Sequence, residues 1–380
     1  MKLGIRAAAI AGLAATGIEL WAAGPQILPR AIDAWDWIAA ADDPVQLTEL
    51  GLKARLTPEA LQDELQSALD ADDIDLAESF VALADQQGLS IPDALRARLA
   101  AATGAAASAR RGARDFYSGL IDGESATGAG LAGVIAGDLT GVGDVRDLVR
   151  EGQKIVRGEE PDQLVLGLAA AGLVLTGATI ASVGVALPAR AGVSTLRVAT
   201  KSGRLSKPLA GELTRLARDV VDPGALALAA TAAGKFEVTA AKAALANAVR
   251  PASLARLRNV AEDVTTIGRR AGVRSAHEAL AITTDTAEIR RIARLAETRG
   301  AGTRAVLKVL GRGAIALTSG AALLAGWVMA GVGYVWLALM FTLALVRRAA
   351  KITLWSGRNF TRLALRTIRP AASPRSHAPR

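Results

Sequence analysis

The chain has 380 residues, of which 51% are hydrophobic and only 3% aromatic, and its formal net charge at pH 7 is +9. It contains no cysteine and two histidines, His277 and His377, which excludes disulfides, thiol nucleophiles, iron–sulfur clusters and thiolate zinc sites. Because the apolar surplus consists of Ala, Leu, Val and Gly, the composition favours an all-α protein with helices in a membrane.

The N-terminal segment, residues 1–23, has the pattern of a membrane signal anchor. Lys2 and Arg6 precede an apolar run in which Glu19 is the only charged residue. A cleavable signal peptide shares these regions, so that alternative stays open, but no small-x-small cleavage site precedes Pro25. We therefore expect residues 1–23 to remain as an anchor.

Residues 24–127 form an acidic segment that we expect to be a soluble helical domain. Thr57-Pro58-Glu59 combines a capping hydroxyl, a proline at the first helical position and a carboxylate in the first turn, so a helix should begin there. The cluster at 70–73 should end that helix, Gly88 should end the next one, and residues 90–93 should start a third. Neighbouring amphipathic helices of this kind form antiparallel hairpins.

Residues 128–163 form a glycine-rich segment. Three of its glycines stand four residues apart, the spacing that lets two helices touch: Gly133, Gly137 and Gly141. Alternatively, Asp138 and Asp144 cap short helices beside the membrane. The acidic residues do not match a calcium-loop spacing and no phosphate-binding loop follows, so neither a metal nor a nucleotide cofactor is implied.

Residues 164–187 are uncharged and predict a central transmembrane span. Three glycines recur every five residues in this segment and would permit close helix contact in lipid: Gly167, Gly172 and Gly177.

Two sequence segments, GVGDVRDLVREG at 141–152 and DQLVLGLAAAGLVLT at 162–176, resemble segments of a bacterial family of membrane proteins that carries no assigned activity. The resemblance covers about residues 70–210 and implies a bacterial membrane protein. The Gly-Val-Gly-Asp step is also similar to the glycine-rich segment that precedes the toxic domain of polymorphic toxins. No toxin catalytic motif follows residue 210.

Charge divides the chain into two halves. Residues 24–164 hold 25 acidic and 12 basic residues, whereas the basic helical domain at 188–312 holds 10 acidic and 22 basic ones. Such a split predicts that the halves face different surroundings. Because basic flanks stay on the cytoplasmic side, we expect the acidic domain outside and the basic domain inside. Nucleic acid is not an expected partner, since the arginines are not interleaved with aromatic residues.

The segment 313–346 has no charged residue and is longer than the roughly 20 residues that one crossing needs. Gly331 and Gly333 lie near its middle and could form the turn of a transmembrane hairpin. Basic residues flank the segment on both sides, which requires an even number of crossings. A shallow re-entrant pair is a variant of the hairpin. A single tilted helix is the alternative, and it would leave three spans in the chain rather than four.

The remaining segment, 347–380, is a basic juxtamembrane tail. Each basic residue near the surface contributes about 1 kcal/mol of attraction to anionic lipid. The candidates for contact with anionic headgroups are Arg347, Arg348, Lys351, Arg358 and Arg362.

His277-Glu278 is the one pair of residues that resembles a general acid–base pair. Neighbours in a helix point away from each other, so we interpret His277 as a solvated helical histidine. No catalytic, cofactor-binding or metal-binding residue is predicted.

The sequence thus predicts a multi-pass protein of a bacterial inner membrane, acting as a non-enzymatic envelope scaffold or interaction protein. The alternatives are a toxin-like or pore-forming membrane protein and a membrane enzyme with an unrecognised site. The expected partners are anionic membrane lipids and a protein that the sequence does not identify, and a homo-oligomer stays open.

Overall fold

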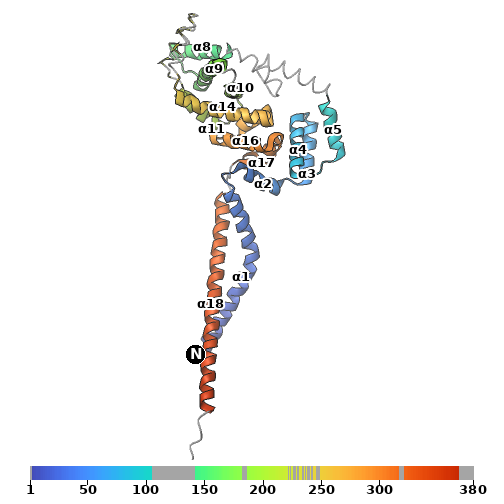
Figure 1. The fold of residues 1–380 in the computed structure, drawn as a ribbon, viewed down its shortest axis with the longest axis vertical. Coiled ribbons are helices and arrows are strands. Elements are labelled where there is room, and N and C mark those ends of the chain that lie inside the picture. The colour runs from blue at the N-terminus through green and yellow to red at the C-terminus, as the bar shows by residue number, and fades with distance from the viewer. Residues whose placement is uncertain are drawn as a thin grey trace, which may run out of the picture. The chain divides into compact units, whose positions relative to one another are not determined.

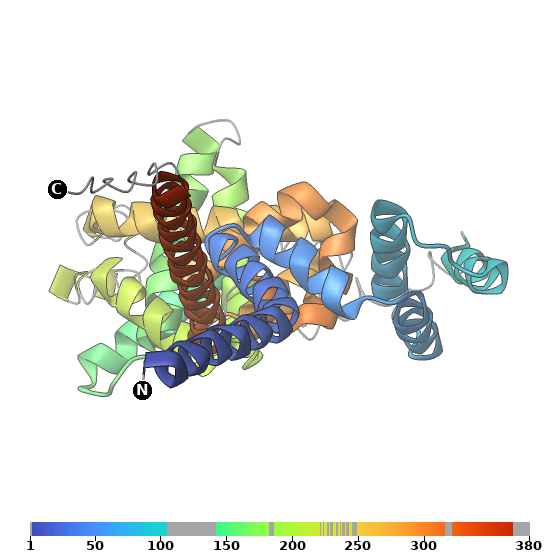
Figure 2. The ribbon, with the colours of Figure 1, turned by 90° about the horizontal axis from the view of Figure 1, so that it is seen from below.

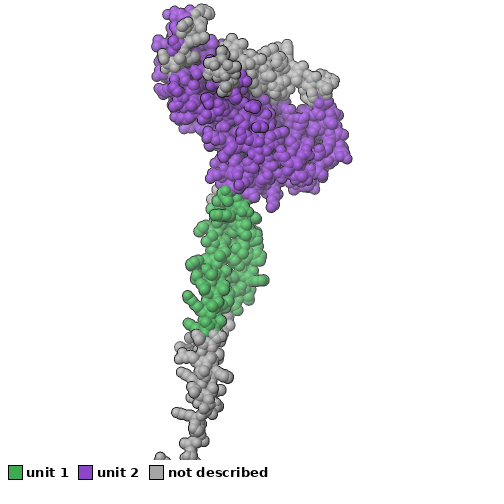
Figure 3. Space-filling view, in the orientation of Figure 1, with its two compact units in different colours: residues 1–39, 319–380 green, residues 40–318 purple. Residues whose placement is uncertain are grey.

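The computed structural model describes residues 2–104, 142–181, 186–220, 249–315 and 321–367, with separate positions between 222 and 244. The described residues form helices and no β-strands, which confirms the all-α prediction. The chain divides into two compact units, drawn in different colours in Figure 3. The first, called the helix pair below, comprises residues 1–39 and 319–380, and the second, called the globular unit, comprises residues 40–318.

Two long helices form the helix pair: α1 (Lys2–Ala39) and α18 (Ala321–Thr367). They lie side by side over much of their length (Figure 1). Early residues of α1 meet late residues of α18, so the helices are antiparallel. Three contacts fix the register: Gly17 with Phe341, Gly24 with Tyr334, and Ala31 with Gly331.

The seam between α1 and α18 follows a seven-residue repeat. On α1, small residues recur at positions 17, 24 and 31, and each faces a residue of α18. A seven-residue repeat keeps the same face of a helix toward its partner, as in left-handed coiled coils. Because Gly17 and Gly24 have no side chain, the rings of Phe341 and Tyr334 fit against α1 at these positions. The Tyr334 hydroxyl also donates a hydrogen bond to the Leu20 carbonyl at 2.9 Å.

The structure does not contain the predicted hairpin at 313–346. Helix α18 runs without a break through Gly331 and Gly333, and residues 311–314 belong to a 3-10 turn of the globular unit. Glycine permits a turn but does not require one. Gly331 instead allows close approach of α1, because a Cβ atom at this position would overlap the side chain of Ala31.

The N-terminal helix is also longer than the predicted anchor of residues 1–23. Helix α1 continues through Gly24 to Ala39, with Pro25 and Pro29 inside it. A proline removes one backbone donor from a helix, and packing against a neighbour offsets that loss. The contact of Gly24 with Tyr334 holds α1 against α18 beside the first proline.

The N-terminal part of the globular unit consists of four helices. Thr57 caps the second of them through a hydrogen bond from the Ala60 N–H, and Gly88 ends the third in the left-handed conformation with φ of 64°. Both features confirm the predicted helix boundaries. The helices are α2 (Pro44–Arg55), α3 (Pro58–Asp70), α4 (Ile74–Gln87) and α5 (Asp93–Thr103).

The rest of the globular unit is a larger helical bundle. In Figures 1 and 2, α16 and α17 lie between α3–α5 and the α8–α11 group. One continuous apolar core joins these parts, from Phe80 to Leu257. The helices are α8 (Val142–Val156), α9 (Gln163–Ala181), α10 (Leu187–Lys201), α11 (Lys207–Val220), α14 (Pro251–Ala271), α15 (Val273–Ile282), α16 (Thr286–Arg299) and α17 (Thr303–Leu310), with 3-10 turns at Gly300–Gly302 and Gly311–Ala314.

The predicted central span at 164–187 is replaced by α9, a core helix of the globular unit. Leu168 is fully buried, and α8, α10 and α11 pack around this helix. Gly167 lies against Ala217 of α11, and Gly172 lies against Asp144 of α8. A helix that is apolar on all sides suits either a protein core or a bilayer, so its composition did not distinguish the two.

The acidic and basic halves of the sequence are not separate domains. Arg304 and Arg274 from the basic half both bind Asp73 from the acidic half, and Arg299 binds Glu49. Residues 40–318 contain 33 basic and 33 acidic residues, so the globular unit is neutral as a whole. The charge split reflects pairing between two parts of one bundle rather than two different surroundings.

Candidate functional site

The exposed surface of α18 is apolar from residue 323 to residue 346, whereas α1 exposes the charged residues Glu19, Arg30, Asp33 and Asp36 beside its apolar ones. Eleven large apolar side chains of α18 are exposed, among them Met329, Trp336 and Leu337, and α1 adds Trp21 and Trp35. Among the described residues, one segment, from residue 323 to residue 351, is long and apolar enough to cross a membrane. Removing eleven such side chains from water is worth on the order of 10 to 20 kcal/mol, more than a typical domain's net stability.

Positive charge collects at one end of the helix pair. Because Gly17 faces Phe341, the start of α1 and the end of α18 share this end. Helical residues 2–16 and 342–367 contain eight basic and no acidic residues. The whole net charge of +9 comes from the helix pair, since the globular unit is balanced.

The predicted packing and lipid-contact residues have different outcomes. Gly167 and Gly172 do pack against neighbouring helices, but inside the globular unit, whereas a Cβ at Gly177 would meet nothing within 4 Å. The predicted lipid contacts lie on α18, where the side chains of Arg347, Arg348 and Lys351 are exposed. The predicted site residues that lie outside the described part of the chain are Gly133, Gly137, Gly141 and the side chains of Arg358 and Arg362.

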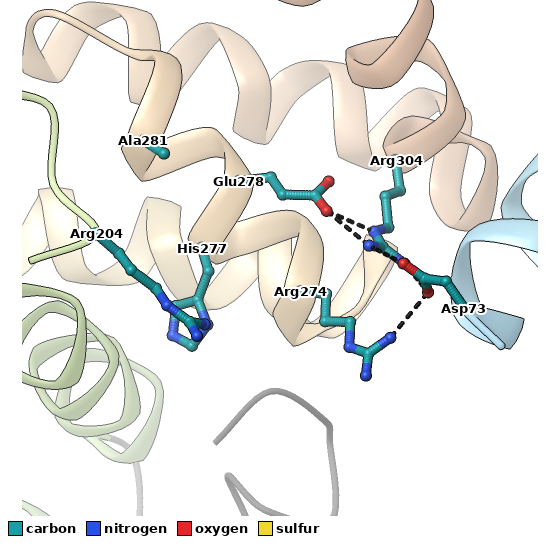
Figure 4. Close-up of a pocket in the computed structure, with 7 residues that line it drawn as sticks. All are labelled: Asp73, Arg204, Arg274, His277, Glu278, Ala281 and Arg304. Carbon is teal, nitrogen blue, oxygen red and sulfur yellow. Dashed lines mark hydrogen bonds and ion pairs between the residues drawn. The ribbon is translucent and has the colours of Figure 1, made fainter. Parts of the chain in front are cut away.

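A charged pocket of about 300 Å³ lies in the globular unit. Four segments that are distant in sequence meet there: the start of α4, the loop after α10, one face of α15, and α17 (Figure 4). We call this cavity the arginine pocket, and its lining residues are Asp73, Arg204, Arg274, His277, Glu278, Ala281 and Arg304.

Arg304 anchors one wall of the arginine pocket. Its guanidinium donates two hydrogen bonds to Asp73, at 2.6 and 2.7 Å, and two more to Glu278, at 3.0 and 2.6 Å. Partial burial alone would raise the pKa of Asp73, but hydrogen bonds and charges from Arg304 and Arg274 outweigh it and lower that pKa below its ordinary value. Asp73 also accepts a hydrogen bond from the Leu76 N–H and so caps α4.

His277 lies on another wall of the arginine pocket. Its side chain is only 4% exposed, so the interpretation as a solvated histidine was wrong. Neither ring nitrogen has a hydrogen-bond partner among the described residues. Burial, together with the positive charge of Arg204, lowers the pKa of His277 from 6.5 to about 4, so the imidazole is neutral at pH 7.

A second charged cluster is buried between α8 and α10. Asp144, which is fully buried, accepts hydrogen bonds from Arg190, at 2.6 Å, and from Arg197, while Lys201 donates to Asp147 at 2.6 Å. Asp144 therefore lies inside the bundle, where it pairs with two arginines of α10. Asp144 and Asp147 on α8, like Arg197 and Lys201 on α10, are separated by about one helical turn. This spacing was a sequence signal for the pairing, and the sequence-based prediction missed it.

No residue of the arginine pocket was predicted as a site, because its members span more than 200 positions and share no local motif. Within the described part of the chain, no group of three His, Cys, Asp or Glu residues is placed to hold a metal ion. Comparison with family models, curated proteins and solved structures found no match to this chain. The two resemblances stated from the sequence therefore stay predictions.

Proposed function

We propose that this protein is a membrane-anchored, non-enzymatic interaction protein: α1 and α18 cross a bilayer together and hold the globular unit at one membrane face. The observation that carries the proposal is the exposed apolar surface of α18, against which α1 packs. At 1.5 Å per residue, residues 323–351 extend about 43 Å, enough for the roughly 30 Å hydrocarbon layer and both interfaces.

The interior of the helix pair also suits lipid. The hydroxyl of Tyr334 is satisfied by the Leu20 carbonyl, so no polar group of that side chain is left facing hydrocarbon. Small residues on α1 let the backbones approach closely, which is how helices associate where the hydrophobic effect between them is absent. Trp35 and Trp327 lie near the same end of the pair, where tryptophans suit a membrane interface.

Charge supports one orientation. The basic end of the helix pair, with Lys2, Arg6 and the arginines after Phe341, is placed in the cytoplasm by the positive-inside rule. The chain enters and leaves the globular unit from the other end of the pair, after Ala39 and before Ala321. The whole globular unit would then lie outside the cytoplasm. A long domain does not oppose this, because its total charge has little influence on export.

Membrane retention tests the proposal. Met329 and Leu337 face outward on α18, and arginine at both positions should cost about 2.5 to 3.5 kcal/mol per residue if they contact lipid. We expect the wild-type protein to stay in the membrane after carbonate washing and the double variant to be lost from it. The matched control is Ala349→Arg, an exposed position beside the basic flank, which should leave retention unchanged. Release of the wild-type protein by carbonate or salt would refute the proposal.

A further inference from the structure

One arginine of the arginine pocket has no acidic partner among the described residues. It contains three guanidinium groups but only two carboxylates. Arg304 binds both Asp73 and Glu278, and Arg274 shares Asp73 at 2.8 Å and pairs with Asp75, outside the pocket lining, at 3.8 Å. Arg204 has no acidic partner among the described residues and its side chain is exposed. An anionic ligand can therefore bind Arg204 without displacing an ion pair within the described part of the chain.

His277 gives an independent sign that a ligand belongs in the pocket. Its two ring nitrogens are buried without hydrogen bonds among the described residues, and a buried polar group without a partner destabilises the folded state. A neutral imidazole has one N–H donor and one acceptor nitrogen. A ligand oxygen in the pocket could accept a hydrogen bond from the ring and recover that cost.

The arrangement in Figure 4 explains how a ligand would reach His277. The guanidinium of Arg204 lies against the imidazole ring, and Arg274 extends from the same helix as His277. Since Arg204 makes no ion pair within the described chain, it can move away from the ring without breaking one. An anion that attracts Arg204 would uncover the ring nitrogen and lie between two guanidinium groups.

We propose that the arginine pocket binds a small molecule through a phosphate or carboxylate group, held by Arg204 and Arg274 and by an N–H of His277. Guanidinium groups form paired, charge-assisted hydrogen bonds with such oxyanions. The volume of about 300 Å³ suits a small organic acid or phosphate ester rather than a polymer. Glu278 and Asp73 do not compete for Arg204, because Arg304 engages both.

The experiment uses the full-length protein in a phosphate-free sugar detergent, with labelled histidine rings observed by NMR. The chain has only two histidines, so a His377→Gln variant assigns the His277 signal. Inorganic phosphate and acetate are titrated separately against sodium chloride at equal ionic strength. A further titration adds phosphatidylglycerol to the micelles, which separates a lipid headgroup from a free anion as the source of the phosphate.

We expect a saturable shift of the His277 signal with phosphate or acetate, in free or lipid form, and none with chloride. Charge-assisted hydrogen bonds are worth about 1.5 to 3 kcal/mol, so Arg204→Ala and Arg274→Ala should each weaken binding at least about tenfold. Arg204→Ala removes no ion pair within the described residues, and circular dichroism checks that it still folds. Arg256→Ala removes an exposed arginine of α14 and should change nothing. The proposal is overturned if no anion gives a saturable shift, or if Arg204→Ala binds as well as the wild type.

Discussion

Replacing Asp73 by Asn should destabilise the globular unit by about 3 kcal/mol. Asn keeps the size of the side chain and its cap of α4 but removes the charge that Arg304 and Arg274 bind. The Arg304 side chain is 6% exposed, so it would keep Glu278 as its single acidic partner in a largely buried place. Breaking one side of a buried ion pair costs about 3 to 5 kcal/mol, and the partial exposure of Asp73 places this site at the lower end.

The chain offers a matched control and a clean assay. Asp70→Asn removes an ion pair of similar length, to Arg98 at 2.8 Å, whose side chains are about half exposed, so it should cost at most about 1 kcal/mol. All six tryptophans lie in the helix pair, so their fluorescence reports that unit alone. Urea unfolding followed by circular dichroism at 222 nm reports all helices, so the transition that tryptophan fluorescence does not follow belongs to the globular unit. Equal effects of the two substitutions would refute the role given to Asp73.

Three further predictions concern other parts of the chain. The folded pKa of His277 is about 4 against 6.5 when unfolded, so the unfolded chain binds more protons between these values, and stability falls as the pH drops through them. The wild type should therefore lose about 2 kcal/mol between pH 7 and pH 5 from this residue, and urea unfolding of His277→Leu should lack that loss. Gly192→Ala would overlap a backbone carbonyl of α14 and should cost at least about 3 kcal/mol, whereas Gly211→Ala, on an open helix surface, should stabilise α11 by about 0.5 to 1 kcal/mol in the same assay. In the helix pair, Gly331→Leu should separate α1 from α18 and lower the midpoint of the thermal transition in tryptophan fluorescence, and Gly333→Leu, which meets no neighbour, should not.

Local chemistry made part of the fold predictable from sequence. The caps at Thr57 and Gly88 depend on residues within one helical turn, and both helix boundaries were found. The apolar run before Arg347 was likewise recognised as suited to a membrane, because its composition alone carries that information.

Contacts between distant residues explain what the sequence did not reveal. The sequence of α9 alone does not distinguish a core helix from a transmembrane span, because its apolar surface is covered by other helices, α8, α10 and α11. Gly331 was taken as a turn because its partner, Ala31, lies 300 positions away. The burial of His277 and its meeting with Arg204 depend in the same way on how the bundle folds.

The cysteine-free sequence permits the most direct test of the central claim, that the entire globular unit lies on one side of a membrane. Single cysteines can be placed at three exposed positions: Ala101 in the acidic half, Ser202 in the basic half, and Ala349 near the basic end of α18. A membrane-impermeant maleimide added to intact spheroplasts should label the cysteines at 101 and 202 and should reach the one at 349 only after permeabilisation. Labelling at 101 with protection at 202 would place the two halves on opposite sides and contradict the account.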